Sequence, residues 1–190
     1  MRIVHNVCDV PEPEKARGEM IYCDALTTNT PRILLGVKTA DCVPLLLGDT
    51  RTGACAGVHA GWRGTLASIA VRTLERMAEE FGTRSEDVTA AIGPAALACC
   101  YEVGAEVIEA FHEKIPGSEA LFKQTRDGHA LVDLQRANRE QLIATGVHAE
   151  RIYSVPLCTM CRTDLFFSYR REKKLHGRVG RLMSVIGKQV

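Results

Sequence analysis

Short apolar runs separated by turn-forming residues dominate the first third of the chain. The runs at residues 32–37, 42–48 and 54–59 are rich in aliphatic and β-branched side chains and have lengths typical of strands. Residues 48–53, with the sequence GDTRTG, lie between the second and third runs and carry residue types that favour turns. We therefore predict that the second and third runs form an antiparallel hairpin.

Residues 65–81 show a helical pattern instead. Thr65 is a residue type favoured at helix N-caps, and Gly82 is one that commonly ends helices. The pattern predicts one helix over residues 65–81 with one apolar face. The residues that form this face recur at intervals of three or four; they are Leu66, Ile69, Ala70, Leu74, Met77, Ala78 and Phe81.

The rest of the chain alternates between the two patterns. Helical spacing predicts helices at about residues 105–114 and 134–145, the second closed by Gly146. Apolar runs predict further strands, at residues 88–93, 130–134, 151–155, 165–169 and 181–186. Because strands outnumber helices and the first hairpin is antiparallel, we expect a mixed α+β sandwich rather than a doubly wound parallel sheet.

The composition describes an ordinary globular protein. The chain has 190 residues without internal repeats, of which 46% are hydrophobic and 25% charged, so we expect a single domain over residues 1–190. A formal net charge of +1 gives no reason to expect a nucleic-acid partner. The sequence contains neither an apolar run of the roughly 18 residues that a membrane span needs nor a secretory signal. We therefore expect a cytoplasmic protein without a membrane partner, whose oligomeric state the sequence does not indicate.

The chain contains many cysteines, and we expect most of them to be free thiols in small buried spaces. Cys158 and Cys161 form one C-x-x-C pair, but without a second such pair we expect a structural or incidental role over a metal or redox role. Cys99 and Cys100 are adjacent, and on an extended chain their side chains would point to opposite faces. The eight cysteines are Cys8, Cys23, Cys42, Cys55, Cys99, Cys100, Cys158 and Cys161.

Cys42 and His59 differ from the other candidates in their positions. In an antiparallel hairpin the start of one strand lies beside the end of the next, so the two side chains can meet on one face. The glycines of AGWRG, which follows His59, let backbone approach a ligand closely, and Arg63 offers a guanidinium for phosphate or carboxylate. The spacing alone slightly favours a core histidine and a buried thiol.

Six stretches, in order along the chain, resemble the successive motifs of the bacterial laccase-domain family. This family is also called the YfiH or multicopper polyphenol oxidase family, and the mammalian enzyme FAMIN is related to it. The resemblance covers about residues 3–186 and implies a cytoplasmic protein with a layered α/β/β/α sandwich of mixed sheets. The stretches are TADCVPLLLGD, VHAGWRGT, AIGPAALACCYEVG, DLQRANREQL, LCTMC and DLFFSYRRE.

The resemblance also implies a metal site, usually zinc, built from two histidines and one cysteine. The matching positions are His5 in RIVHN, Cys42 in TADC and His59 in HAGWRG, and the last two are also predicted to be catalytic. Ile3 replaces a glutamine of the family's first motif. Three protein ligands leave a fourth position for water or substrate, as in catalytic zinc sites. Family members carry several dozen residues before this motif, so we expect an N-terminally shortened domain.

The activity that the resemblance implies is on purine nucleosides. It comprises phosphorolysis of adenosine, inosine, guanosine or methylthioadenosine, and hydrolytic deamination of adenosine; purine nucleosides and phosphate are therefore the expected partners. For the phosphate we predict Arg63 and Arg170 as the cations. Asp41 and Glu102 are candidates for the general acid, although Asp41, as the neighbour of Cys42, is expected to point to the opposite face.

Two other enzyme classes remain open. Copper-dependent oxidation of phenols in multicopper oxidases uses about ten ligands rich in histidine, and six histidines cannot build that set. A single Cu²⁺ ion in place of zinc is compatible with the His–Cys–His ligands. Alternatively, Cys42 is a nucleophile with His59 as its base, in a cysteine hydrolase that acts on a peptidoglycan precursor. A bound metal would block Cys42 as a nucleophile, so metal occupancy distinguishes the cysteine hydrolase from the metal-dependent enzymes.

Overall fold

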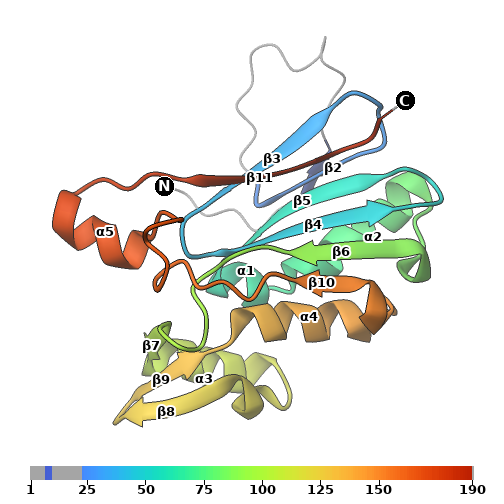
Figure 1. Cartoon of the computed structure of the whole chain (residues 1–190). Helices are drawn as coiled ribbons and strands as arrows, with labels where there is room; N and C mark the ends of the chain where they lie inside the picture. Colours follow the sequence, from blue (N-terminus) through green and yellow to red (C-terminus); the bar gives the residue numbers. More distant parts are fainter. Residues whose placement is uncertain (1–6, 10–22, 190) are drawn as a thin grey trace.

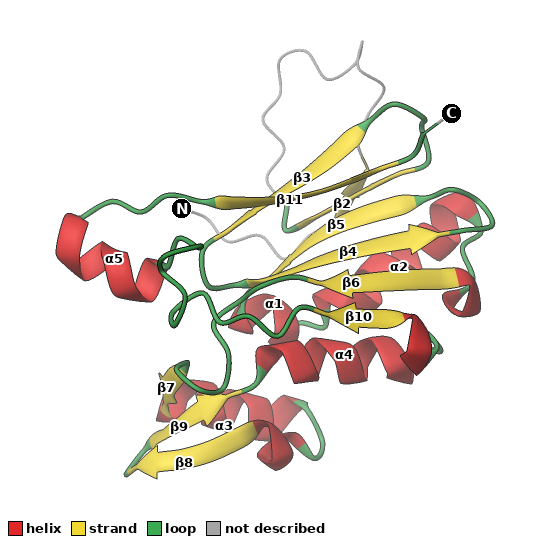
Figure 2. Cartoon of the chain, in the orientation of Figure 1, coloured by secondary structure: helices red, strands yellow, loops and turns green. Residues whose placement is uncertain are grey.

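The computed structural model describes residues 7–9 and 23–189. Over this part of the chain the fold is a mixed α+β arrangement with three sheets, which confirms the predicted class (Figure 1; Figure 2). None of the helices formed by these residues has the length and apolar character needed to cross a membrane.

A six-stranded sheet forms the centre of the molecule. Its middle is the antiparallel pair β4 and β5, which is the predicted hairpin. The side chains of Leu45, Leu47 and Val58 on this pair are completely buried. In spatial order the strands are β1 (Val7–Asp9), β2 (Ala25–Thr28), β5 (Cys55–Ala60), β4 (Val43–Asp49), β6 (Val88–Ile92) and β10 (Ile152–Ser154).

Helices cover one face of this sheet and a second sheet covers the other (Figure 1). The helical layer contains α1 (Trp62–Leu66), α2 (Ile69–Phe81) and α4 (Leu134–Ala144), with α2 against β2 and β5. The second sheet is the antiparallel pair β3 (Leu34–Thr39) and β11 (Leu182–Gly187), which contacts β4 and β5.

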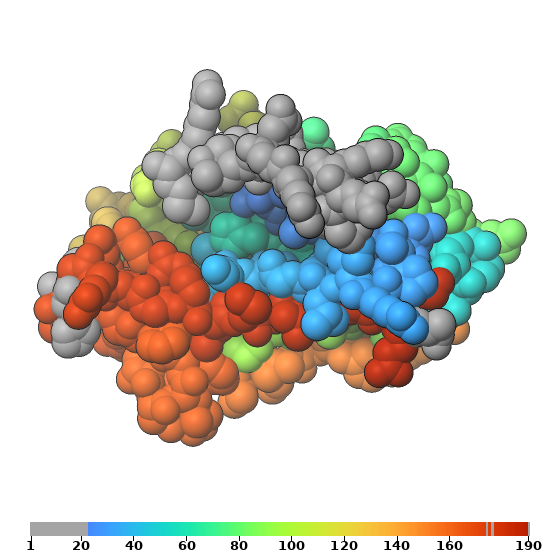
Figure 3. Space-filling model, turned by 90° about the horizontal axis from the view of Figure 1, so that it is seen from above, coloured from blue at the N-terminus to red at the C-terminus, as the bar shows by residue number. Residues whose placement is uncertain are grey.

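The outer face of β3 and β11 is exposed. The two strands lie side by side at the surface in Figure 3, where blue and red atoms adjoin. Leu34, Met183 and Val185 on this face are each more than half exposed, at 73%, 59% and 51%. Among the residues that the structure describes, no helix lies over this face (Figure 1).

A third sheet, the small sheet of three short strands, lies apart from the other two at the lower end of Figure 1. It consists of β7 (Glu102–Gly104), β9 (His129–Val132) and β8 (Phe122–Arg126), and it packs against α3 (Ala105–Lys114). The helix predicted at residues 105–114 is confirmed by α3. The remaining elements are α5 (Tyr169–His176) and three 3₁₀ turns, at Ser85–Asp87, Ser118–Leu121 and Ala149–Arg151.

The helix predicted over residues 65–81 is two helices. The helical conformation is interrupted at Ser68, whose φ is +53°, and α1 already begins at Trp62, before Thr65. The predicted N-cap at Thr65 is therefore wrong: its hydroxyl is buried inside α1 and accepts a hydrogen bond from Asn138 Nδ2 at 2.9 Å. The Thr65 hydroxyl, which the local pattern assigned to a helix cap, therefore makes a tertiary contact with α4 instead. Gly82 ends α2 in the left-handed conformation, as predicted.

The strand predicted at residues 165–169 is also wrong. These residues form a turn that leads into α5, whose N-cap is Ser168. The Ser168 hydroxyl accepts from the Arg171 N–H, and the Glu172 carboxylate accepts from the Ser168 N–H at 3.0 Å. Leu165 and Phe167 are 55% and 46% exposed, so the apolar run does not mark buried chain. Reciprocal capping hydrogen bonds favour a helix start here over the strand propensity of the aromatic residues.

Candidate functional site

His59 lies near the end of β5, between β2 on one side and β4 on the other. On the β2 side, its backbone N–H donates to the carbonyl oxygen of Asp24 at 2.7 Å. Because residues opposite each other on antiparallel strands share a face, the side chains also meet, with Asp24 Oδ1 2.8 Å from His59 Nδ1. This contact orients the imidazole and leaves Nε2 for a second partner.

Cys42 lies on the other side of His59. Pro44 of β4 is opposite His59, so Cys42, two residues earlier, is its diagonal neighbour on the same face. The thiol forms a hydrogen bond with the His59 side chain. A Cβ atom at Gly61 would lie 3.1 Å from Cys42 Sγ and 3.9 Å from His59 Cε1, so this glycine keeps space beside the pair. The hairpin therefore brings both residues together, while their binding of a metal stays a prediction.

The charge of His59 depends on these neighbours. Burial alone would lower the pKa of His59, but the hydrogen bonds and charges of Cys42 and Asp24 outweigh it and raise the pKa to about 9. In the metal-free protein the ring is therefore protonated at neutral pH. Since a metal binds only the neutral imidazole, metal uptake at this position releases a proton.

The Asp41 carboxylate is buried and makes structural contacts. Asp41 has a φ of +82°, an unusual backbone conformation for a residue with a side chain. Its buried carboxylate accepts hydrogen bonds from the Thr159 hydroxyl at 2.7 Å, the Ser168 hydroxyl at 3.1 Å and the Arg170 N–H at 2.7 Å. These three donors occupy the carboxylate, so the arrangement disfavours Asp41 as a general acid. It ties the first turn of α5 to the residues just before β4, where Cys42 lies.

Arg170 and Tyr101 lie next to the Asp41 carboxylate. The Arg170 guanidinium is 4.9 Å from the Tyr101 ring centroid, and its Nη1 donates to the carbonyl oxygen of Glu102 at 2.9 Å. Burial raises the pKa of Tyr101, the charge of Cys42 adds to this rise, and Arg170 opposes it. Tyr101 therefore lies within electrostatic range of both Cys42 and Arg170. The motif ACCYEVG contains this tyrosine, but no pattern in the sequence distinguishes it as a functional residue.

Glu102 is held as an anion. Its carboxylate accepts hydrogen bonds from the Thr125 hydroxyl at 2.8 Å and from Arg126 Nη2 at 2.9 Å. The hydrogen bond from Arg126 lowers the pKa of Glu102. A carboxyl group that stays ionised is a poor proton donor, so the arrangement disfavours Glu102 as a general acid.

A polar hollow of about 330 Å³ lies beside Arg170, between α1 and the small sheet. Arg63 is exposed, and its guanidinium stacks on the Trp62 ring at 4.1 Å, so it adjoins the hollow through Trp62. Neither Cys42 nor His59 lines the hollow. The lining residues are Trp62, Glu102, Val103, Gly104, Glu106, Val107, Arg126, His129 and Arg170.

His5, the third predicted ligand, lies outside the described residues. Strand β1 begins at Val7, which pairs in parallel with Ala25, the residue after Asp24. Strand β1 therefore starts at the same end of the sheet as the Asp24–His59 contact. The assignment of His5 stays a prediction.

The structure also brings four cysteines together that the sequence analysis did not connect. The Sγ atoms of Cys99, Cys100, Cys158 and Cys161 all lie within 4.8 Å of one another, close enough to hold a metal ion. The expectation that Cys99 and Cys100 point to opposite faces is wrong, because they lie in a turn in which the Cys100 N–H donates to Leu97 O at 2.9 Å. The C-x-x-C pair thus has a second pair beside it in space.

Comparison with known proteins places the chain in one family. The model of the family described as multi-copper polyphenol oxidoreductase laccase matches residues 2–189. The crystal structure of Bacillus licheniformis hypothetical protein YfiH superimposes with a TM-score of 0.91 at 31% identity, over 99% of this chain and 72% of that one. A fold match of this quality agrees with the mixed α+β architecture described above.

Two curated relatives carry names of enzymes. A purine nucleoside phosphorylase of Bacteroides thetaiotaomicron is 44% identical over 167 residues, which are 86% of this chain and 61% of the relative. Adenosine deaminase RL5, from an unknown prokaryotic organism, is 40% identical over 164 residues, again 86% of this chain and 61% of the relative. The chain thus spans about three fifths of the length of these relatives.

Proposed function

Because the chain belongs to the multi-copper polyphenol oxidoreductase laccase family, which includes YfiH, we propose that it acts on purine nucleosides. The reactions are phosphorolysis of adenosine, inosine, guanosine or methylthioadenosine, and deamination of adenosine. Relatives named purine nucleoside phosphorylase and adenosine deaminase support this choice. The observation that carries it is the contact of His59 with both Cys42 and Asp24 at one end of the central sheet.

The proposed metal ligands are His5, Cys42 and His59. The donor set of one thiolate and two imidazoles suits Zn²⁺, with Cu²⁺ as the alternative ion. Two features of the described residues fit an ion there: Asp24 fixes the His59 ring through Nδ1, and Gly61 keeps space beside the Cys42 sulfur. A zinc ion supplies a Lewis acid that stabilises developing negative charge.

In the proposed phosphorolysis, two arginines bind phosphate, the second substrate. In this reaction a phosphate oxygen forms a bond to C1′ while the bond from C1′ to the purine breaks, and the purine leaves with the electron pair and takes up a proton. Arg170 and Arg63 are the proposed phosphate cations. The Arg170 backbone N–H donates to Asp41, and its guanidinium donates to the Glu102 carbonyl oxygen and packs on Tyr101, so the side chain is oriented before phosphate binds.

Deamination of adenosine needs water in place of phosphate. Water adds at C6 of the adenine ring, and ammonia leaves from the same carbon, which gives inosine. As a proposed metal ligand whose Nδ1 contacts Asp24, His59 has no ring nitrogen left for proton transfer to the substrate. The Asp41 and Glu102 carboxylates are occupied by other donors, so this chain supplies no carboxylic acid from those two positions.

A specific observation also favours a cysteine hydrolase as the second candidate. Cys42, His59 and Asp24 are arranged as a nucleophile, a base and an orienting carboxylate, which is the order of a catalytic triad. Alkylation separates the two candidates. A nucleophilic Cys42 reacts rapidly with iodoacetamide whether or not zinc is present, whereas a metal ligand is protected until the zinc is removed.

The test of the proposal is an assay with adenosine, in the presence and absence of phosphate, read by chromatography. Adenine and ribose 1-phosphate that appear only with phosphate establish phosphorolysis, and inosine in both reactions establishes deamination. Cys42→Ala is expected to abolish both products, while Cys55→Ala, which removes a buried thiol outside the site, retains them. Full turnover by Cys42→Ala would overturn the assignment of the site.

A further inference from the structure

The four clustered cysteines come from two loops that the sheet topology places next to each other. Strands β6 and β10 are parallel neighbours, so their C-terminal ends lie side by side. The loop after β6 carries Cys99 and Cys100, and the loop after β10 carries Cys158 and Cys161. The two loops also pair directly, through a bridge between Ala95 and Cys158. The cluster is therefore built into the fold at the edge of the central sheet.

The distances between the sulfurs match one shared ion. All four Sγ atoms lie within 4.8 Å of one another; Cys161 Sγ is 3.1 Å from Cys100 Sγ and 3.6 Å from Cys99 Sγ. In a tetrahedral site with zinc–sulfur bonds of about 2.3 Å, the sulfurs are about 3.8 Å apart. Four thiols that only fill space have no reason to converge on one point, since a thiol is a weak hydrogen-bond donor.

A tight turn holds the C-x-x-C pair in place. The Cys161 N–H and the Arg162 N–H both donate to the Cys158 carbonyl oxygen, at 3.2 Å and 3.0 Å. Next to it, the Thr159 N–H donates to the Ala95 carbonyl oxygen at 3.0 Å, which joins this turn to the loop of the other two cysteines. Backbone hydrogen bonds therefore fix the positions from which all four sulfurs converge.

We propose that Cys99, Cys100, Cys158 and Cys161 bind one Zn²⁺ ion in a closed site that is separate from Cys42 and His59. Four protein sulfurs fill a tetrahedral coordination sphere and leave no position for substrate, so the site is structural. Binding converts the thiols to thiolates with release of their protons and involves no oxidation or reduction. Iron is the other metal that four thiolates commonly hold, and metal analysis distinguishes it.

The ion would fix the loops that surround the candidate active site. The loop that carries Cys99 and Cys100 also contains Tyr101 and the N–H of Ala96, which donates to the Asp41 carbonyl oxygen at 2.8 Å. The other loop contains Thr159, whose hydroxyl donates to the Asp41 carboxylate. Both loops therefore contact Asp41, the neighbour of Cys42. A zinc ion bound by the four cysteines would hold the two loops together at this point.

The test is a metal count on the full chain purified in reducing buffer without added metal, with zinc and iron measured by mass spectrometry. The decisive protein is Cys42→Ala, which lacks the other proposed site and is expected to retain about one zinc ion per chain. Adding Cys161→Ser to Cys42→Ala should remove that ion, and adding Cys55→Ala should leave it. Cys161 is exposed, so its change to serine disturbs packing less than Cys158→Ser would.

A second readout reports the ligands directly. In Cys42→Ala reconstituted with Co²⁺, the absorption bands of sulfur-to-cobalt charge transfer should appear and should be lost with Cys161→Ser. A zinc-free Cys42→Ala protein with freely reactive cluster thiols overturns the proposal. So does iron in place of zinc, or a Cys100–Cys161 disulfide in freshly reduced protein. These readouts do not use nucleoside turnover, so failure of the proposed function leaves them unaffected.

Discussion

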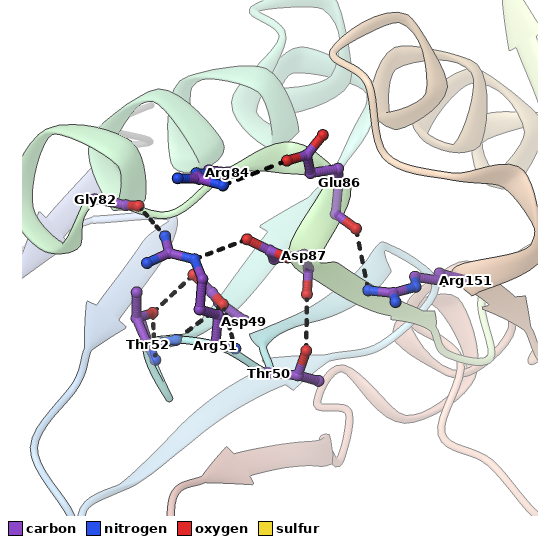
Figure 4. A network of polar contacts seen from close by, with 10 residues as sticks. Asp49, Thr50, Arg51, Thr52, Gly82, Arg84, Glu86, Asp87 and Arg151 are labelled. Atoms are coloured by element: carbon purple, nitrogen blue, oxygen red, sulfur yellow. Dashed lines mark hydrogen bonds and ion pairs between the residues drawn. The ribbon is translucent and has the colours of Figure 1, made fainter.

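The two ends of strand β4 use buried aspartates in different ways. At the end shown in Figure 4, Asp49 accepts hydrogen bonds from the Arg51 N–H at 2.7 Å, the Thr52 N–H at 3.1 Å and the Thr52 hydroxyl at 2.7 Å. Arg51 in turn binds Asp87 at 2.8 Å and the carbonyl oxygen of Gly82. The partners of Asp49 are two or three residues away in the chain.

At the opposite end, the partners come from distant parts of the chain. Asp41 binds Thr159, Ser168 and Arg170, at separations of 118, 127 and 129 residues. Asp24 reaches His59 across 35 residues. Asp49 itself therefore stabilises a local turn, whereas the contacts of Asp41 and Asp24 form only when distant parts of the chain have come together. We expect mutations at the first end to change stability and mutations at the second to change activity.

The largest effect is expected for Cys42→Ala. Loss of the proposed zinc ligand should lower nucleoside turnover at least about 10³-fold, which corresponds to about 4 kcal/mol of transition-state stabilisation. The thermal unfolding midpoint should change little, because Cys42 is only half-buried. Chromatographic turnover assays and a melting curve on the same sample check both expectations. Cys55→Ala is the control.

Asp24→Asn should have the next largest effect. It removes the negative charge that orients and supports His59, and loss of such a partner typically reduces metal affinity or activity about 10- to 100-fold. The neutral amide keeps the size of the side chain, so the stability should be nearly unchanged. Zinc affinity measured with a competing chelator, together with turnover, is the readout. An unchanged affinity would mean that Asp24 does not support a metal ligand.

Asp49→Asn should change stability and leave the activity of each folded molecule unchanged. Burial raises the pKa of Asp49, but hydrogen bonds from the Thr52 hydroxyl and from the Thr52 and Arg51 N–H groups outweigh it and place the pKa below the usual 3.8. A charged group with such bonds contributes about 2 kcal/mol to the free energy of unfolding. This contribution is present above pH 3.8 and is lost as the pH falls through the lower folded-state pKa. Urea unfolding of both proteins at pH 7 and near pH 3 should therefore show a difference that shrinks in acid.

Arg51→Ala should have the smallest effect. The Arg51 and Asp87 side chains are 43% and 26% exposed, so solvent screens their ion pair and the loss should be about 0.5–1 kcal/mol. Arg84, paired with Glu86 at 3.7 Å and more exposed, provides the matched control, with no measurable change expected for Arg84→Ala. Denaturant midpoints measured in low and high salt check the difference. An Arg51 effect that salt leaves unchanged would point to the Gly82 hydrogen bond instead of the ion pair.

The sequence predicted the features that depend on neighbouring residues. The hairpin of β4 and β5 and the helix α3 follow from local patterns, and so does the meeting of Cys42 and His59. Asp24 was not predicted, because its contact requires the pairing of β2 with β5, which no local pattern records.

The cysteine cluster was not predicted from the sequence, for a similar reason. It depends on a turn at Cys99 and Cys100 and on the parallel pairing of β6 with β10. The error at residues 165–169 has a different origin, since the apolar side chains there are exposed at a helix start stabilised by capping. The missed features are therefore those created by tertiary contacts rather than by periodicity.

Gly61 determines how this region tolerates sequence change. Its φ is −73°, which every residue type adopts easily, so the backbone itself does not require glycine. The restriction comes only from the Cys42 sulfur, 3.1 Å from where a Cβ atom would lie. In a deep mutational scan, selection for cellular abundance should therefore accept small side chains at position 61. Selection for enzymatic turnover should reject them, and the gap between the two scores marks a residue retained for chemistry and dispensable for folding.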